Sequence, residues 1–166
     1  MTHAWIDALV QPSSLLREAS SPEERAIYAV SLLIEGRLDR HAALAEEERR
    51  RGEGADPIWT SGQVDELTRG LILLREGNSE AFQLLASAAD NQGSADIAFV
   101  GAVVLNLALS DVGRPDMALT VLANHRGLAR TYPERALLQI HAGLRQAELG
   151  NASVALAAMR DAVRLS

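Results

Sequence analysis

The sequence predicts an all-α fold, an α-solenoid of about four antiparallel helical hairpins with a short N-terminal helix. Apolar residues recur at spacings of three and four along most of the chain, which is the period of one helix face. Glycines able to end a helix stand at positions 36, 77, 113 and 150, at intervals of 41, 36 and 37 residues. Aromatic residues make up only 4% of the chain, and no stretch alternates convincingly as a half-buried strand would.

The N-terminal part of the chain contains three predicted helices. Residues 3 to 10 form a short amphipathic helix, which Pro12 interrupts. Ser21 opens the run Ser-Pro-Glu-Glu, a capping pattern that starts a second helix, and Gly36 ends it. A third helix runs over about residues 39 to 51, where acidic residues precede basic ones as the helix dipole favours.

These predicted helices divide the chain into two segments. We expect an N-terminal helical segment at residues 1 to 20 and a helical repeat domain at residues 21 to 166. Inside the repeat domain, residues 52 to 57 form the clearest loop because they combine glycine, proline and charged residues. The next helix can be capped by Ser61 and ends at Gly77.

The middle of the chain contains the most apolar segment. A return helix runs over about residues 80 to 89, and residues 95 to 112 then carry apolar side chains on nearly all sides. Such a pattern is typical of a helix buried between neighbours. The β-branched residues leave a buried strand at residues 99 to 105 as an alternative. Gly113 ends this segment and Pro115 opens its return helix.

The last two helices form the clearest hairpin. Thr131 and Glu134 fit a capping box around Pro133, so a helix begins here. Gly150 ends this helix because glycine adopts a left-handed backbone without penalty, and Asn151 can cap the next one through its side-chain oxygen. The apolar stripes of the two helices are Leu137, Ile140, Leu144 and Ala147 in the first, and Ala155, Met159 and Ala162 in the second.

Composition limits the chemistry that the protein can perform. The net charge is −6, and all 16 basic residues are arginine. The absence of lysine excludes a Schiff-base lysine and the lysine of a phosphate-binding loop. The absence of cysteine excludes disulfides, thiolate nucleophiles and cysteine-bound metals. An acidic chain is also a poor ligand for phosphate backbones, so we expect no nucleic-acid partner.

The N-terminus lacks the basic and apolar regions of a secretory signal. No apolar run approaches the roughly 20 residues that a membrane span needs. We therefore expect a soluble, cytoplasmic protein without a membrane partner.

A repeated pattern surrounds the turn glycines. Gly113 and Gly150 are each followed by alanine five residues later and by a bulky residue four further on. A small residue, Gly70 or Gly143, stands seven residues before a turn glycine, although Asn106 occupies this place before Gly113. The pattern resembles the tetratricopeptide repeat (TPR), whose first helix carries a Leu-Gly motif and whose second carries Ala-x-x-x-Phe.

The TPR resemblance implies a concave groove lined by the first helix of each hairpin. An apolar groove of this kind suits an amphipathic helix or an apolar peptide from a partner protein. The alternative is that a tight superhelix, or the segment around Trp5, fills the groove as core. The predicted groove residues are Ala26, Val30, Leu33, Leu67, Leu71, Leu74, Val103, Leu107, Ile140 and Leu144.

Catalytic patterns are weak throughout. The four histidines form no pair at helical metal-ligand spacing, so we predict no metal, no cofactor and no catalytic residue. His141 is most simply a hydrogen-bonded packing residue. The arginines at 49 to 51 could meet an acidic partner or phosphate, but pairing with the preceding glutamates explains them. The looser cluster of Arg126, Arg130 and Arg135 has the same two interpretations.

These observations favour a non-catalytic interaction module, an adaptor or small chaperone. Bacterial type III secretion chaperones offer an analogy of similar size and architecture. The second hypothesis is a regulatory or sensor module, such as the helical-repeat part of a transcriptional regulator, which binds a small molecule or reports assembly. A ligand-sized cavity near Trp59 or His141 would favour the second hypothesis. Self-association into a homo-oligomer fits either.

Overall fold

The computed structural model describes residues 32, 37, 62–90, 92 and 95–165. Every regular element in these residues is a helix, so the predicted all-α class is confirmed and the strand considered at residues 99 to 105 is wrong. The N-terminal segment and the first predicted hairpin lie outside the described residues. The elements are α4 (Gly62–Arg75), α5 (Glu80–Ala89), α6 (Ala95–Asp111), α7 (Pro115–Asn124), the 3-10 helix η1 (Arg126–Leu128), α8 (Tyr132–Glu148) and α9 (Ala152–Leu165).

The chain divides into two compact units, Met1–Ala88 and Ala89–Ser166. In the first unit, α4 and α5 form a hairpin whose turn contains Gly77 at φ +71°. Asn78 Oδ1 accepts a hydrogen bond of 2.9 Å from the backbone N–H of Glu80, which caps the start of α5. A side-chain hydrogen bond of 2.7 Å from Ser87 to Glu66 also joins the two helices.

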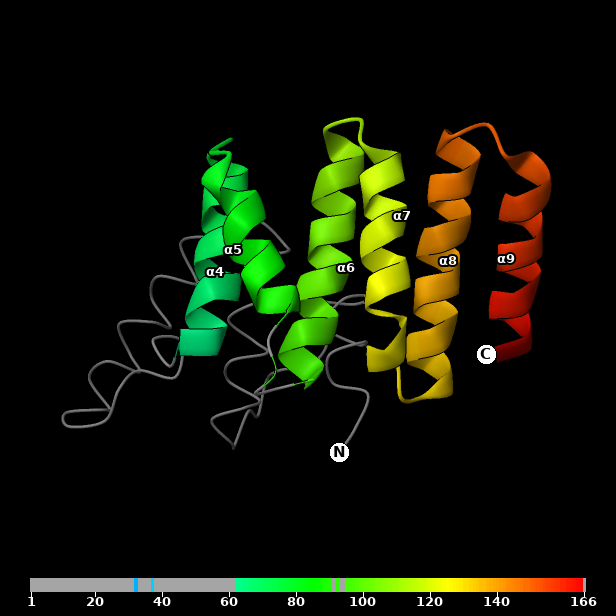
Figure 1. The fold of residues 1–166 in the computed structure, drawn as a ribbon, viewed down its shortest axis with the longest axis horizontal. Helices are drawn as coiled ribbons and strands as arrows, with labels where there is room; N and C mark the ends of the chain where they lie inside the picture. The colour runs from blue at the N-terminus through cyan, green and yellow to red at the C-terminus, as the bar shows by residue number, and fades with distance from the viewer. Residues whose placement is uncertain (1–31, 33–36, 38–61, 91, 93–94, 166) are drawn as a thin grey trace. The chain divides into compact units, whose positions relative to one another are not determined.

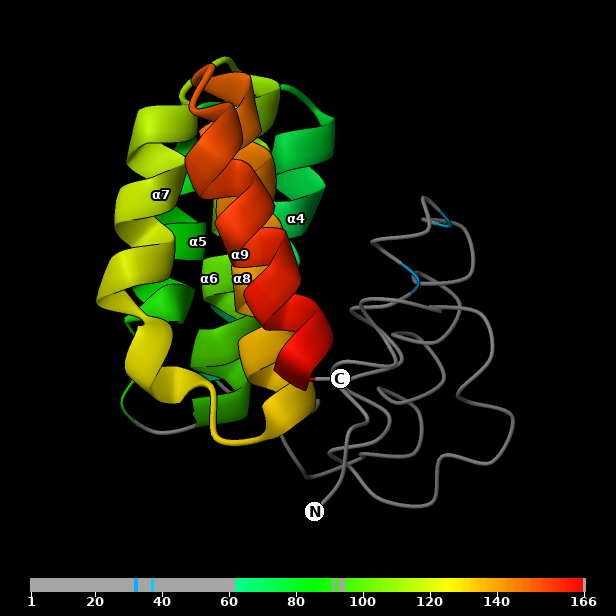
Figure 2. The same ribbon diagram turned by 90° about the vertical axis from the view of Figure 1, so that its right-hand side faces the viewer.

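The second unit contains two hairpins, α6–α7 and α8–α9, and its four helices run alternately up and down (Figure 1). Each helix packs against the next one along the chain, and α6 also contacts α8. Figure 2 shows α9 in front of α8, the helix on which it packs. Gly113 and Gly150 occupy the two turns with φ of +74° and +79°, as their positions in the repeat pattern predict.

Local signals place the ends of the helices in this unit. Pro115 stands in the first turn of α7, as predicted. The capping box of α8 is complete, because Thr131 accepts from the N–H of Glu134 and Glu134 accepts from the N–H of Thr131. Asn151, which the sequence predicts as the cap of α9, donates a hydrogen bond of 2.8 Å from its side-chain Nδ2 to Gln146 Oε1.

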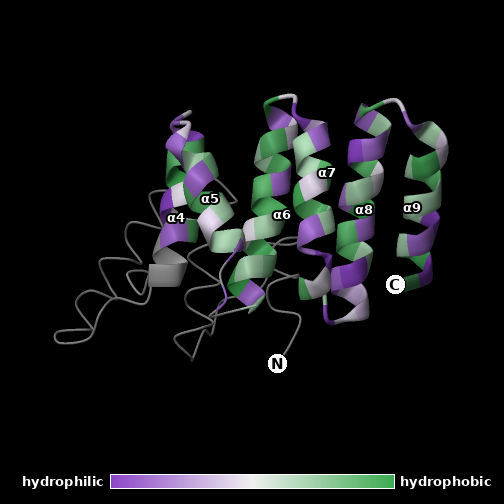
Figure 3. Ribbon diagram, in the orientation of Figure 1, coloured by the Kyte–Doolittle hydropathy of each residue, from purple (hydrophilic) through white to green (hydrophobic). Residues whose placement is uncertain are grey.

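Helix α6 is the core of the second unit. Twelve of its residues are buried, and Figure 3 shows hydrophobic colours along most of its length. The prediction of a helix buried on nearly all sides is therefore confirmed. Because α7 and α8 both pack against α6, its apolar side chains are removed from water on several faces.

Small residues let the helices of a hairpin approach closely. A Cβ atom added at Gly70 would lie 2.9 Å from Leu85 Cγ, and one added at Gly143 would lie 3.0 Å from Met159 Cε. Both glycines stand seven residues before a turn glycine, so the repeat pattern marks the site of contact between first and second helix. Asn106, which stands at the corresponding place in α6, is fully buried.

Candidate functional site

The predicted groove residues do not share one environment. Ala26, Val30 and Leu33 lie outside the described residues. In the first unit, Leu67 and Leu71 are buried and Leu74 is half-buried.

In the second unit, Val103 is a core residue with 1% of its surface exposed. Leu107, Ile140 and Leu144 are instead 39%, 40% and 41% exposed. These three large apolar side chains come from the first helix of each hairpin, α6 and α8, as the TPR resemblance implies for a groove. We call them the apolar patch.

Two hydrogen bonds cross from α6 to α8 beside the apolar patch. Asn106 Nδ2 lies 3.2 Å from His141 Nδ1, and Ser110 Oγ donates to Glu148 Oε2 at 2.7 Å. The second bond is displaced from the first toward the C-terminus on both helices, so α6 and α8 run parallel. Residues three and four apart share a helix face, so the patch residues border this polar row.

Asn106 is the most deeply buried member of the polar row, with no exposed surface. Its Nδ2 also lies 3.5 Å from the carbonyl oxygen of Val103. Its Oδ1, however, has no hydrogen-bond partner. Leaving a buried carbonyl oxygen unpaired costs about 1–3 kcal/mol of stability. A donor that reaches Asn106 Oδ1 would therefore gain a favourable hydrogen bond.

His141 acts as an acceptor in this row. The amide of Asn106 can only donate through Nδ2, so His141 Nδ1 must carry a lone pair and the ring must be neutral. Burial, and secondly the positive charge of Arg145, lower the pKa of His141 to about 4. The prediction that His141 is a hydrogen-bonded packing residue is therefore confirmed.

Arg145 is a buried charge one helical turn beyond His141. It is 5% exposed, and its Nη2 forms an ion pair of 2.8 Å with Glu148 Oε1. Its Nε and Nη1 are buried without any hydrogen-bond partner. A guanidinium that keeps two unpaired nitrogens in a site of low dielectric attracts an acceptor strongly.

Sequence reasoning did not assign a role to Asn106 or Arg145. The sequence did single out Asn106, because it occupies the position seven residues before a turn glycine where the other two hairpins have glycine. For Arg145 there was none, because an arginine at this spacing is expected on the solvated face of a helix. Only the packing of α8 against its neighbours makes it buried.

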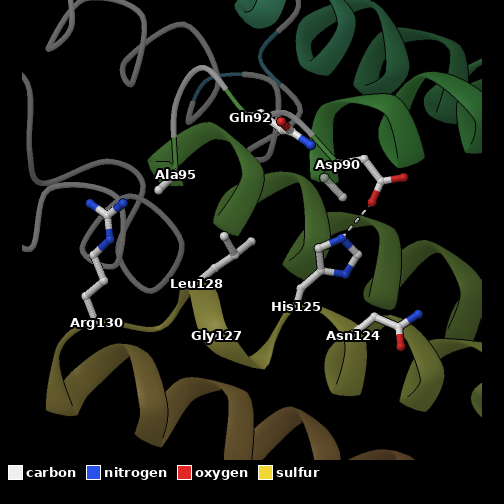
Figure 4. A pocket seen from close by; sticks show the side chains of 9 residues that line it. Asp90, Gln92, Ala95, Asn124, His125, Gly127, Leu128 and Arg130 are labelled. Atoms are coloured by element: carbon white, nitrogen blue, oxygen red, sulfur yellow. Dashed lines mark hydrogen bonds and ion pairs between the residues drawn. The ribbon is translucent and has the colours of Figure 1, made fainter.

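A separate cavity of about 490 Å³ lies where the C-terminal end of α7 meets the start of α6. In Figure 4, the side chains of His125 and Asp90 point toward each other on one side of the cavity, and Arg130 lies on the opposite side. His125 Nε2 is 3.0 Å from Asp90 Oδ1, and its Nδ1 donates to the carbonyl oxygen of Val121 at 2.8 Å.

Both ring nitrogens of His125 are engaged, so neither is left to take a proton from a substrate. Among the described residues that line this cavity there is no serine, threonine or tyrosine, so none of them places a hydroxyl nucleophile beside the His125–Asp90 pair. The pair instead ties the segment at Asp90 to the end of α7. We therefore interpret the His125–Asp90 pair as a structural contact.

Within the part of the chain that the structure describes, no group of three or more His, Asp or Glu side chains could hold a metal ion. No helix among these residues is long and apolar enough to span a membrane. The arginines at 49 to 51 and Trp59 lie outside the described residues. Arg126, Arg130 and Arg135 are all exposed.

Comparison with protein-family models, curated proteins and solved structures finds no match for this chain.

Proposed function

We propose that this protein is a non-catalytic interaction module, a TPR-like adaptor or chaperone, which binds an amphipathic helix of a partner protein. The observation that carries the proposal is the apolar patch of Leu107, Ile140 and Leu144, which remains about 40% exposed beside a polar row that includes the buried Asn106. Parallel first helices with an apolar, partly exposed surface are suited to accept a helix by its apolar face.

The free energy gained by covering the apolar patch is sufficient for a transiently bound partner. Covering the exposed part of each of the three side chains contributes roughly 1–2 kcal/mol at about 25 cal/mol per Å². This total of several kcal/mol is reduced by the cost of association, so additional polar contacts are needed for tight binding. Arg145 and Asn106 supply an unpaired donor group and an unpaired acceptor next to the patch.

These unpaired atoms define the partner's chemistry further. A helix with an Asp or Glu beside its apolar stripe offers a carboxylate to Arg145, while a donor such as Gln or Ser satisfies Asn106 Oδ1. Binding then requires side-chain rearrangement around both residues, because Asn106 Oδ1 and the unpaired nitrogens of Arg145 are covered in the unbound chain. We expect such a partner to bind more weakly when its acidic residue is replaced by an amide.

The test is affinity capture from a lysate of the source organism with three forms of the protein. Leu144→Arg disrupts the apolar patch, and Val112→Arg is the matched control, because Val112 is 56% exposed in the turn directly after α6 and lies outside the patch. Circular dichroism must first show that all three forms have the same helix content. Light scattering separates capture of a partner from self-association.

The expected result is a protein with an amphipathic helix that wild type and Val112→Arg retain and Leu144→Arg loses. Equal retention by the two variants would rule out the patch as the partner site.

A regulatory or sensor module that binds a small molecule is the second candidate. It is favoured by a cavity of about 790 Å³ in the second unit, which is within the usual range of ligand pockets. His141 does not line this cavity, although Gln139 and Ala142 of the same helix do.

A further inference from the structure

The cavity of about 790 Å³ lies between α7, η1, α8 and the C-terminal end of α9. Helix lengths explain why space remains here. Helix α7 has 10 residues and α8 has 17, so α7 spans about 15 Å and α8 about 26 Å. The short helix ends early, and η1 with the following residues covers the remaining part of α8 only loosely.

The walls of the cavity are mostly apolar. Leu119 and Leu122 come from α7, Leu138 and Ala142 from α8, and Leu165 from the last turn of α9. Leu122 and Leu138 are buried, and the other three are half-buried. A ligand body in this cavity is therefore shielded from water on one side by side chains from three helices.

Charge in the cavity has one sign. Arg126 and Arg135 line it, and none of the described residues that line it is Asp or Glu, although the whole chain carries a net charge of −6. Within residues 95–165, Arg126 forms no ion pair. Arg135 forms no ion pair with the residues of this segment either. Both guanidinium groups can therefore accept an anionic partner.

The surroundings of Arg135 strengthen this positive field. It stands in the first turn of α8, where the helix macrodipole is already positive. Its Nε donates to the carbonyl oxygen of Ala129 at 3.3 Å, and its guanidinium lies 5.9 Å from the centre of the Tyr132 ring. These contacts orient the side chain and leave its terminal nitrogens for a ligand. The nearby Glu134 carboxylate accepts from the backbone N–H groups of Arg130 and Thr131.

We propose that this cavity binds a small amphipathic anion, a carboxylate with an apolar body of the size of a medium-chain fatty acid. Arg126 and Arg135 hold the carboxylate, because a guanidinium offers two parallel N–H donors to its two oxygens. The apolar walls take the body. The site deepens the second candidate function and does not depend on the apolar patch of α6 and α8, so either can fail without the other.

The test uses sodium decanoate as the probe, titrated into the full chain by calorimetry below its micelle concentration. Decyltrimethylammonium has the same chain and the opposite charge, so it measures apolar binding without the anionic head. We expect saturable binding of decanoate and none of the cation. Amide shifts in nitrogen–proton NMR spectra should move at Ala142, Leu165 and Arg126 and stay unchanged at Leu107 and Leu144.

Three variants test the assignment of residues. Arg126→Gln and Arg135→Gln should each weaken decanoate binding by about tenfold, the effect of losing a charge-assisted hydrogen bond. Arg160→Gln is the control, because Arg160 is exposed on α9 and does not line the cavity. Equal binding of decanoate and the cation, an unchanged affinity in both cavity variants, or shifts confined to the apolar patch would each overturn the proposal.

Discussion

Asn106 Nδ2 lies 3.2 Å from His141 Nδ1, and this contact joins the first helices of the two hairpins in the second unit. The asparagine occupies a position that holds glycine in the neighbouring hairpins. The histidine must be neutral to accept its hydrogen bond. Asn106, which departs from the repeat pattern, therefore contacts the titratable residue His141. This contact lies beside the apolar patch that we propose binds a partner.

Acid should destabilise the protein through His141. Its pKa is about 4 in the folded chain and about 6.5 when unfolded, so the unfolded chain binds more protons between these pH values. Stability from this group is complete above pH 6.5 and is lost as the pH falls toward 4, by about 3 kcal/mol in total. Urea unfolding at pH 7.5 and pH 4.5 measures the effect.

The matched control for the acid effect is His141→Gln, which cannot gain a proton. Carboxylate protonation changes the stability of both proteins, so the difference between them isolates His141. If wild type and His141→Gln lose equal stability between the two pH values, the assignment of a depressed pKa to His141 is wrong.

Replacing Arg145 should raise the pKa of His141. In Arg145→Met the positive charge that contributes to the low pKa is gone, while burial, the larger cause, remains. We expect the pKa to rise from about 4 and to stay below 6.5, as an NMR titration of the ring protons would show. A pKa that stays at its wild-type value would exclude an electrostatic effect of Arg145 on His141.

The same substitution should leave the fold at least as stable as wild type. Methionine fills a similar volume and removes two unpaired buried nitrogens, and replacing a buried charge with an apolar residue of similar volume is often neutral or stabilising by about 1 kcal/mol or more. Glu148 keeps its hydrogen bond to Ser110. A loss of more than about 1 kcal/mol in urea unfolding would mean that Arg145 stabilises the unbound fold.

Gly70→Ala should destabilise the first unit by about 1–2 kcal/mol. A new Cβ would lie 2.9 Å from Leu85 Cγ and 3.3 Å from the Leu85 backbone nitrogen, so the buried Leu85 side chain or the helix α5 itself must shift. This cost exceeds the gain of about 1 kcal/mol in helix propensity. Gly127→Ala is the control, since its Cβ would meet nothing within 4 Å, and thermal unfolding should find it close to wild type.

Removing the capping box of α8 should cost about 1 kcal/mol. The Glu134 carboxylate accepts hydrogen bonds of 2.6 Å from the Arg130 N–H and 2.7 Å from the Thr131 N–H, and Glu134→Ala leaves both donors without it. Glu134→Gln keeps a carbonyl acceptor, so it should lose less than half as much in denaturant unfolding. Similar losses for the two variants would show that charge, and not hydrogen bonding, makes the contribution.

Part of the site was predictable because its causes are local. Helical periodicity placed Leu107, Ile140 and Leu144 on the first helices of their hairpins, where the structure has them. Periodicity could not separate Leu107 from Val103, which are four residues apart in a helix that is apolar on nearly all sides. In α8 the large apolar stripe stays half-buried or exposed, and the buried residues are Ala136, Leu138, Gly143 and Arg145.

The sequence by itself determined the helices of the described hairpins and their ends. Turn glycines, Pro115 and the Thr131–Glu134 box act within a few residues, so their effect does not depend on the rest of the fold. Tertiary structure alone decided that Asn106 and Arg145 are buried with unpaired atoms. It also decided that Arg126 and Arg135 line a cavity in which none of the described lining residues carries a carboxylate. Burial and electrostatic surroundings depend on residues distant in the chain, and only packing brings those residues together.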